Sequence, residues 1–153
     1  MEDRYAVLID IVRSREQDDR VRTQRTILQV LDEVNTTVPA ADKMRATVGD
    51  EFQGTYTKLS DALLATALVT LKLPDTLDCR FGIGAGAVWE IGTGRNGGIQ
   101  DGPGWWSARA AIDAGREREK TSAPWTRSWY RLGQTQRPVD HHEGLVNALL
   151  TCR

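Results

Sequence analysis

Residues 5–12 have the sequence YAVLIDIV, and this stretch decides the fold. It is apolar without alternation except at Asp10, which is typical of a central strand covered on both faces of its sheet. An ionised carboxylate in such a strand is costly unless it is paired, hydrogen-bonded or bound to a metal ion. Asp10 therefore marks a candidate functional residue near the end of the first predicted strand.

The segments on either side of this strand alternate between helical and extended patterns. The capping-box spacing of Ser14 and Gln17 predicts a helix to about Thr37, and residues 44–56 predict a hairpin with Asp50 at its tip. The later predicted elements are a helix from an N-cap at Ser60 to Pro74, a strand over residues 79–88, a turn over 93–98, a helix over 105–114, a strand near 125–132 and a helix within 141–153. This order is the split βαβ arrangement, so we predict an α/β (α+β) domain with a ferredoxin-like βαββαβ fold.

Length and composition restrict the class of protein. A chain of 153 residues, 40% of them hydrophobic, fits one domain, expected over residues 1–153 with a core at about 4–116 and a C-terminal strand and helix at about 124–152. The formal net charge of -1 argues against binding of nucleic acid through bulk charge, so no direct nucleic-acid binding is expected. The two cysteines lack zinc or disulfide spacing, and no apolar run reaches the roughly 18 residues of a membrane span. We therefore expect a cytoplasmic protein without membrane contact.

The predicted topology brings Asp10 close to Asp50. In a split βαβ fold the first strand and the following hairpin are neighbours in the sheet, so we expect the two carboxylates to face one another. Such a pair is repulsive unless a divalent cation lies between the two groups, and magnesium takes one or two carboxylates while leaving positions for water and phosphate oxygens. The alternative is that Asp10 caps a backbone turn and Asp50 only serves the hairpin.

Three motifs carry a resemblance to known families: LIDIVRSR at residues 8–15, VGDEFQG at 48–54 and RFGIGAG at 80–86. In this order and spacing they resemble the SatD family and, more distantly, the class III nucleotidyl cyclases and GGDEF cyclases. The segment at residues 101–109, with Trp106 and Arg109, adds to the SatD likeness. The resemblance covers nearly the whole chain and implies the palm-type domain of nucleotidyl cyclases.

Similarity to the cyclases implies a nucleotide site built on these motifs. It implies that Asp10 and Asp50 hold two Mg²⁺ (or Mn²⁺) ions, with Ile11 beside them, and that the backbone and side chains after Asp10 hold phosphates. The residues implied at the nucleotide are Ile11, Arg13, Ser14, Arg15, Gly49, Glu51 and Trp105, and those implied in catalysis are Asp10, Asp50 and Arg109. Arg109 could stabilise charge on a transferring phosphoryl group. The plainer alternatives are a surface ion pair for Arg109 and a helix cap for Ser14.

Other residues depart from the cyclase pattern or have a simpler explanation. Trp105 occupies the position of the catalytic asparagine of the cyclases, and Ala46 that of their adenine-selecting lysine. One of Trp105 and Trp106 is expected in the core, with the other free to stack on a base or partner. The alternating glycines of residues 82–86 predict close approach of a packed helix or a ligand. The run REREK at 116–120 is expected to be a solvated helix end without a function.

Two functions therefore compete. The first is a metal-dependent nucleotidyl cyclase or nucleotidyltransferase that forms a cyclic nucleotide or an oligonucleotide from a nucleoside triphosphate, working as the homodimer that the resemblance implies. The second is a nucleotide sensor without efficient catalysis, because Trp105 replaces the asparagine. The SatD resemblance implies that such a module is normally linked to a DNA-binding segment, which this sequence does not contain. A purely structural role as a dimerisation scaffold leaves Asp10 unexplained.

Overall fold

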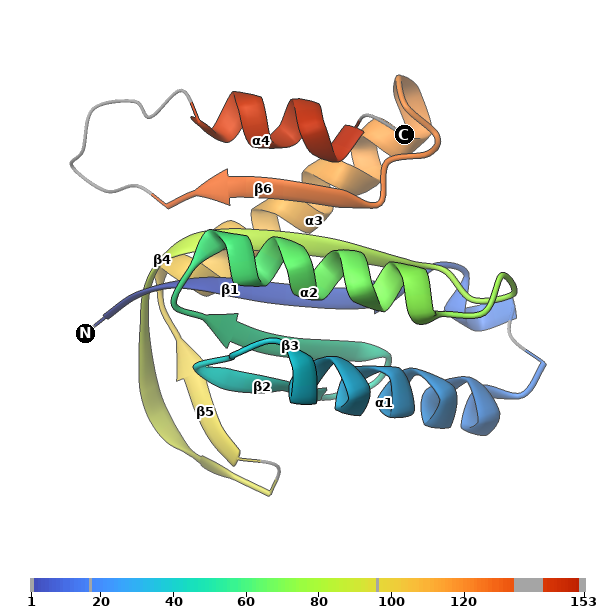
Figure 1. Cartoon of the computed structure of the whole chain (residues 1–153), viewed down its shortest axis with the longest axis horizontal. Coiled ribbons are helices and arrows are strands. Elements are labelled where there is room, and N and C mark those ends of the chain that lie inside the picture. The colour runs from blue at the N-terminus through green and yellow to red at the C-terminus, as the bar shows by residue number, and fades with distance from the viewer. Residues whose placement is uncertain (1, 17, 96, 134–141, 152–153) are drawn as a thin grey trace.

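The computed structural model of the chain describes residues 2–16, 18–95, 97–133 and 142–151. Its strands form a six-stranded sheet in the order β2-β3-β1-β4-β5, with β6 also paired to β4 (Figure 1). The elements are β1 (Glu2–Ile11), a short 3-10 helix (Ser14–Glu16), α1 (Arg20–Thr37), β2 (Asp42–Ala46), β3 (Glu51–Tyr56), α2 (Leu59–Lys72), β4 (Cys79–Gly94), β5 (Gly97–Asp101), α3 (Pro103–Thr121), β6 (Ser128–Leu132) and α4 (His142–Thr151). The strands β2, β3, β1 and β4 are antiparallel neighbours, which confirms the predicted ferredoxin-like order.

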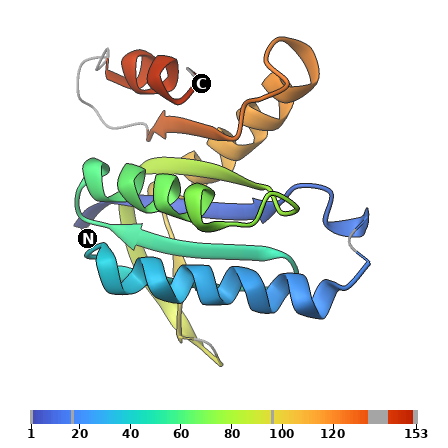
Figure 2. The same cartoon turned by 45° about the vertical axis from the view of Figure 1, so that its right-hand side comes forward.

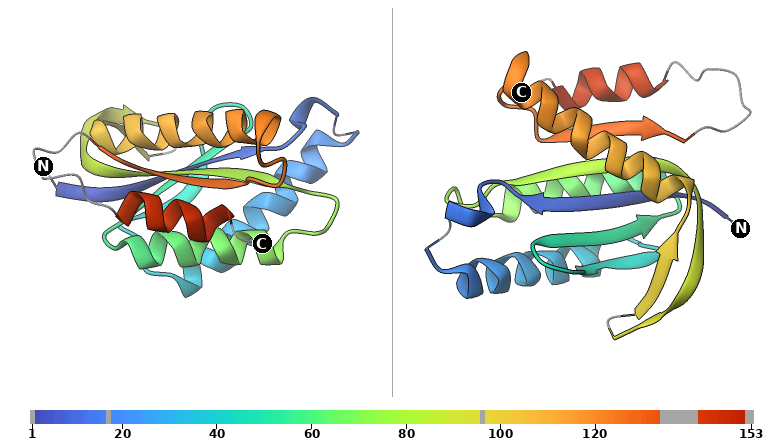
Figure 3. Two further views of the ribbon diagram at one scale, coloured as in Figure 1. Left: turned by 90° about the horizontal axis from the view of Figure 1, so that it is seen from above. Right: turned by 180° about the vertical axis from the view of Figure 1, so that it is seen from behind.

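The central strand β1 is covered on both faces, as its continuous apolar sequence predicts. Val7, Ile9 and Ile11 pack into the larger core under α1 and α2, while Ala6 and Leu8 pack against α3. Figure 1 shows α1 and α2 in front of the sheet, and Figure 3 shows α3 crossing the opposite face. Because side chains alternate along a strand, Asp10 belongs to the α3 face, where its residue is only 7% exposed.

Two glycines of β4 let α3 lie directly on the sheet. A Cβ atom at Gly82 would lie 2.2 Å from the main-chain oxygen of Ala108, and one at Gly84 would lie 2.1 Å from the main-chain nitrogen of the same residue. Neither distance is compatible with a side chain. The glycine pattern predicted close approach of a packed helix or a ligand, and at Gly82 and Gly84 the structure shows that it is the helix α3.

Several predicted boundaries are wrong. The first helix begins at Arg20 rather than near Ser14, because Asp19 is its N-cap and accepts a hydrogen bond from the main chain of Arg22. The second helix begins at Leu59, with Lys58 as N-cap, so Ser60 lies inside it. The predicted starts of both helices relied on local capping patterns, which more than one residue near each helix start can satisfy.

The second half of the chain also differs from the prediction in extent. β4 continues to Gly94 and pairs with β5, so the predicted turn over residues 93–98 belongs largely to a two-stranded ribbon that leaves the main sheet (Figure 2). α3 runs from Pro103 to Thr121 instead of over residues 105–114. The predicted strand near 125–132 is β6, which lies parallel to β4.

The C-terminal helix α4 packs on β6. The side chain of Asn147 accepts a hydrogen bond from the main-chain nitrogen of Tyr130 at 2.7 Å and donates one to its main-chain oxygen at 2.8 Å. Asn147 therefore satisfies main-chain groups of β6 that face α4. Among the helices described, none has the length and apolarity that crossing a membrane requires.

Candidate functional site

The predicted acidic residues lie where β1 ends and β3 begins. Asp10 is next to last in β1, and its cross-strand partner is Glu51, the first residue of β3. Asp50 lies in the turn before β3, beside Gly49 with a positive φ of 72°. The expectation that Asp10 faces Asp50 is therefore off by one residue, because the register of β1 and β3 places Glu51 opposite Asp10.

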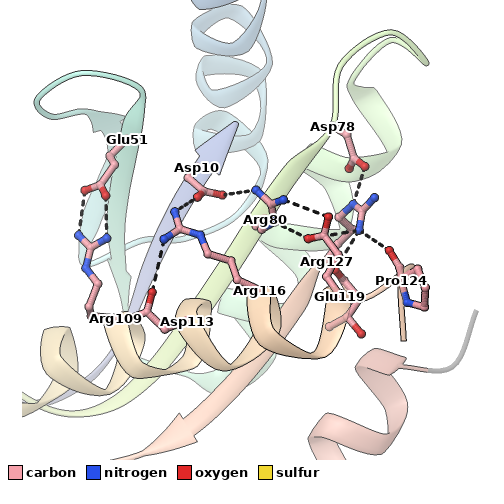
Figure 4. Close-up of polar contacts among 11 residues, drawn as sticks. Asp10, Glu51, Asp78, Arg80, Arg109, Asp113, Arg116, Glu119, Pro124 and Arg127 are labelled. Carbon is pink, nitrogen blue, oxygen red and sulfur yellow. Dashed lines mark hydrogen bonds and ion pairs between the residues drawn. The ribbon is translucent and has the colours of Figure 1, made fainter. Parts of the chain in front are cut away.

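Asp10 and Asp50 contact arginines from different helices. Arg116 of α3 donates a hydrogen bond to Oδ2 of Asp10 (Figure 4). Arg20 of α1 donates one to Oδ1 of Asp50 at 2.8 Å. Because α1 and α3 cover opposite faces of the sheet, each carboxylate is held from its own side.

The run at residues 116–120 is not merely a solvated helix end. Besides the contact between Arg116 and Asp10, Glu119 accepts two hydrogen bonds from Arg80, at 2.6 and 3.0 Å. Figure 4 shows these residues in one row of charges along α3 and the ends of β1 and β4. The prediction of no function for this run missed them because helical spacing alone does not show which face of α3 meets the sheet.

The second acidic residue on this face, Glu51, is paired with Arg109 of α3. Two guanidinium nitrogens of Arg109 donate to the two carboxylate oxygens of Glu51, at 2.6 and 2.9 Å. These hydrogen bonds lower the pKa of Glu51 and raise that of Arg109. The ion pair named above as the plainer role of Arg109 is therefore present, and it places the guanidinium beside the strand end that carries Asp10.

The donor atoms at Asp10 suit a hard divalent cation that also binds a ligand. Within the described part of the chain, Oδ1 of Asp10 is buried and has no hydrogen-bond partner, and the nearest Arg80 nitrogen lies 3.7 Å away. The same residues contain no group of three or more His, Cys, Asp or Glu side chains arranged to hold a metal ion. Magnesium characteristically uses one or two protein carboxylates together with water and phosphate oxygens. The site therefore fits a metal that arrives with a phosphorylated ligand.

A pocket of about 440 Å³ opens next to the pair of Glu51 and Arg109. It lies between the sheet and α3 and is lined by Leu8, Gln53, Gln100, Trp105, Trp106 and Arg109. A volume of this size lies within the range of small-molecule sites, and the lining combines indole rings with two amides and a guanidinium. Such a mixture can stack on a planar ring and hydrogen-bond its edge.

Of the two adjacent tryptophans at the start of α3, one is buried and the other is exposed, as their neighbouring positions on a helix predict. Trp105 is 9% exposed and packs into the core under α3, whereas Trp106 is 58% exposed. The indole nitrogen of Trp106 donates to Asp101 at 2.8 Å, which fixes the orientation of the ring. Both residues line the pocket.

The two glutamines of the pocket were missed by the sequence reasoning. Gln53 could have been found, because it lies two residues after Glu51 and so on the same face of β3. Gln100 could not, because it lies on β5, which was not predicted.

Gln100 also contacts an acidic residue beside the pocket. The amide nitrogen of Gln100 donates to Asp42 at 3.0 Å. Burial would raise the pKa of Asp42, but hydrogen bonds from Thr55 and Gln100 together with the charges of Arg4 and Arg45 lower it below its usual value.

The remaining predicted nucleotide residues lie in and after the end of β1. Ile11 is a buried residue of β1, and Ser14 opens the short 3-10 helix. Arg13 has a positive φ of 53°, which is unusual for a residue other than glycine and marks a tight turn directly after β1. The side chain of Arg15 lies outside the described residues.

The hydrogen bonds between Glu51 and Arg109 give a test in acid. A carboxylate whose pKa is lowered in the folded state stabilises it above the unfolded pKa and loses this contribution as the pH falls through the folded value. We expect Glu51→Gln to reduce the free energy of unfolding at pH 7 and to approach wild type at pH 3. Urea unfolding of both proteins at several pH values measures this. A difference that stays constant from pH 7 to pH 3 would show that the pair is not formed.

Comparison with known proteins gives a family and a fold. The model of the SatD family matches residues 4–124. No curated protein shows significant sequence similarity to the chain. Among solved structures, a bacterial light-regulated adenylyl cyclase superposes with a TM-score of 0.64 at 12% identity, covering 84% of this chain and 75% of that one.

Two further solved structures have the same arrangement of sheet and helices. The guanylate cyclase domain of RhGC from Catenaria anguillulae, in complex with GTP, gives a TM-score of 0.56 at 13% identity and covers 73% of this chain and 72% of its own. An EAL/GGDEF domain protein from M. capsulatus gives 0.52 at 11% identity, with 88% and 86% covered. The predicted likeness to nucleotidyl cyclase and GGDEF domains is confirmed at the level of the fold.

Proposed function

Because the chain belongs to the SatD family and has the fold of nucleotidyl cyclases, we propose that it binds a nucleoside triphosphate or a related nucleotide on the α3 face of its sheet. The observation that carries this proposal is the continuity of the pocket with the acidic strand ends. Arg109 lines the pocket and also holds Glu51, which is the cross-strand partner of Asp10.

The base is proposed to lie in the pocket. The exposed ring of Trp106 offers a surface for stacking, Trp105 lies at the wall of the pocket, and the amides of Gln53 and Gln100 can hydrogen-bond a base edge. Arg109 at the border of the pocket can pair with a phosphate, because a guanidinium presents fixed donors to phosphate oxygens.

The phosphates are proposed to extend toward the end of β1. Asp10, the main chain of Ile11 and the turn residue Asp50 would hold Mg²⁺ or Mn²⁺, with Arg13 and Ser14 near the phosphates. When bound, the metal would neutralise phosphate charge and fix the orientation of the triphosphate. Arg20 and Arg116 balance the charge of these two aspartates in the structure described here.

Binding, rather than turnover, is the activity that this geometry supports best. Trp105 stands where the resemblance places an asparagine in the cyclases, and its indole packs in the core with Leu8 and Ile112. An indole offers one donor and no acceptor, so it does not reproduce an asparagine amide. The domain is therefore proposed as a nucleotide sensor, and formation of a cyclic nucleotide or oligonucleotide, favoured by retention of Asp10 and Asp50, is the second candidate.

Product analysis separates these two functions. The protein is incubated with each ribonucleoside triphosphate and Mg²⁺ or Mn²⁺, and the products are resolved by chromatography. We expect no product beyond that formed by Asp50→Ala, while turnover by wild type alone would establish the cyclase or nucleotidyltransferase. Light scattering of the same samples tests the proposed homodimer.

The role of Arg109 in binding has its own test. We expect Arg109→Gln to weaken nucleotide affinity about tenfold, because one charge-assisted contact to phosphate is lost. Arg95→Gln is the matched control, since Arg95 is an exposed residue of the link between β4 and β5. Equal affinities for the two variants, measured by titration of tryptophan fluorescence, would remove Arg109 from the site.

A further inference from the structure

One arginine of α3 occupies the position where the proposed metal would meet Asp10. Arg116 donates a hydrogen bond to one oxygen of this carboxylate, while the second oxygen has no hydrogen-bond partner in the described structure. The carboxylate residue is 7% exposed, so its charge needs a nearby cation. Two cations are within reach, Arg116 and Arg80.

These two arginines are held very differently. Arg80 makes two hydrogen bonds with Glu119, has a side chain only 18% exposed and lies 3.7 Å from Asp10. The side chain of Arg116 is 39% exposed, and its other partner, the exposed Asp113, lies 3.4 Å away. Arg80 is thus fixed in the sheet, whereas Arg116 reaches Asp10 from a helix surface and can turn out to solvent once another cation neutralises the buried carboxylate.

We infer that Arg116 is an internal counter-ion that competes with a divalent cation for Asp10. A metal ion at Oδ2, the oxygen that faces away from the ion pair with Arg80, would take the position that the Arg116 guanidinium now occupies, and two cations that close repel strongly where water is scarce. Metal binding therefore requires Arg116 to leave Asp10, and the released guanidinium then lies near the proposed phosphates. This inference rests on the proposed metal position but not on the identity of the nucleotide.

The test measures binding of Mn²⁺ alone to the full chain by electron paramagnetic resonance of the free ion. Arg116→Gln removes the competing charge, and we expect it to tighten Mn²⁺ binding at least about tenfold relative to wild type. Arg116→Lys, which keeps the charge, and Arg95→Gln, which removes a distant one, should bind Mn²⁺ as wild type does. The double variant Asp10→Asn with Arg116→Gln should lose the gain.

Two results would overturn the inference: an affinity of Arg116→Gln equal to that of wild type, or a gain that persists when Asp10 is also replaced. Circular dichroism establishes that each variant is folded.

A second measurement follows the side chain of Arg116 in the wild-type protein by nitrogen-15 NMR. The guanidinium signal of Arg116 is identified as the one that is absent from the spectrum of Arg116→Lys. We expect saturating Mg²⁺ to shift that signal and to leave Arg95 unchanged, and an unshifted Arg116 would contradict the competition. Because no nucleotide is present, a failed nucleotide proposal leaves these results intact.

Discussion

Gly84→Ala is expected to destabilise the protein by about 3 kcal/mol or more, which lowers the melting temperature by roughly 6 to 12 °C. The added methyl group would lie 2.1 Å from the main-chain nitrogen of Ala108 and 2.3 Å from the main-chain oxygen of Gly104. Both atoms belong to the backbone of α3, so no side-chain rotation relieves the overlap. The helix must move away from β4, and the packing of Trp105 and the adjacent pocket changes with it.

Gly92→Ala is the control for this substitution. It lies in the same strand, and its added methyl group would be 3.9 Å from the nearest atom, the Cδ1 of Ile99. We expect a change within about 0.5 kcal/mol. Thermal and urea unfolding of the three proteins would contradict the described packing of α3 if Gly84→Ala were as stable as Gly92→Ala.

Asp10→Asn is expected to abolish the effect of metal on nucleotide affinity. The substitution keeps the shape of the side chain but removes the anionic oxygen available to a cation. Loss of a metal ligand should weaken nucleotide binding in Mg²⁺ by about tenfold or more, which is the whole gain in affinity that Mg²⁺ gives the wild type. In EDTA no metal is bound, so the substitution should change the affinity little. It removes only a negative charge that repels the phosphates.

Asp113→Asn makes the same chemical change at the other carboxylate that contacts Arg116. Its side chain is 59% exposed, so we expect nucleotide affinity and its dependence on Mg²⁺ to remain as in wild type. Titration calorimetry with and without EDTA measures both variants. If Asp10→Asn retained the response to Mg²⁺, the metal would have to bind elsewhere.

Much of the fold follows from patterns in the sequence. The apolar run of β1, broken only at Asp10, and the periodic helices predicted the correct order of the core elements, and the glycines of β4 predicted the close approach of a helix or a ligand. Helix starts were less accessible, because Ser14 and Asp19 both suit an N-cap and only the packing of α1 decides between them. The ribbon of β4 and β5 was missed, since residues 93–98 contain three glycines that suit a turn equally well.

The candidate site was accessible only in part. The acidic residue in an apolar strand identified Asp10 without knowledge of the strand register. Its cross-strand partner, Glu51, could be identified only once the register of β1 and β3 was known. The arginines that hold these carboxylates come from α3, and their positions depend on how that helix crosses the sheet. Helical spacing placed Arg116 in a charged run but did not show that it reaches Asp10.

The measurement that tests the central claim most directly is titration calorimetry of the full chain with the four ribonucleoside triphosphates in Mg²⁺ and in EDTA. We expect at least one triphosphate to bind saturably at one site per chain, with an affinity at least about tenfold higher in Mg²⁺. Cyclic and linear oligonucleotides are titrated in the same way. Absence of metal-dependent binding by all of these ligands at millimolar concentration would contradict the proposal that this domain is a nucleotide site.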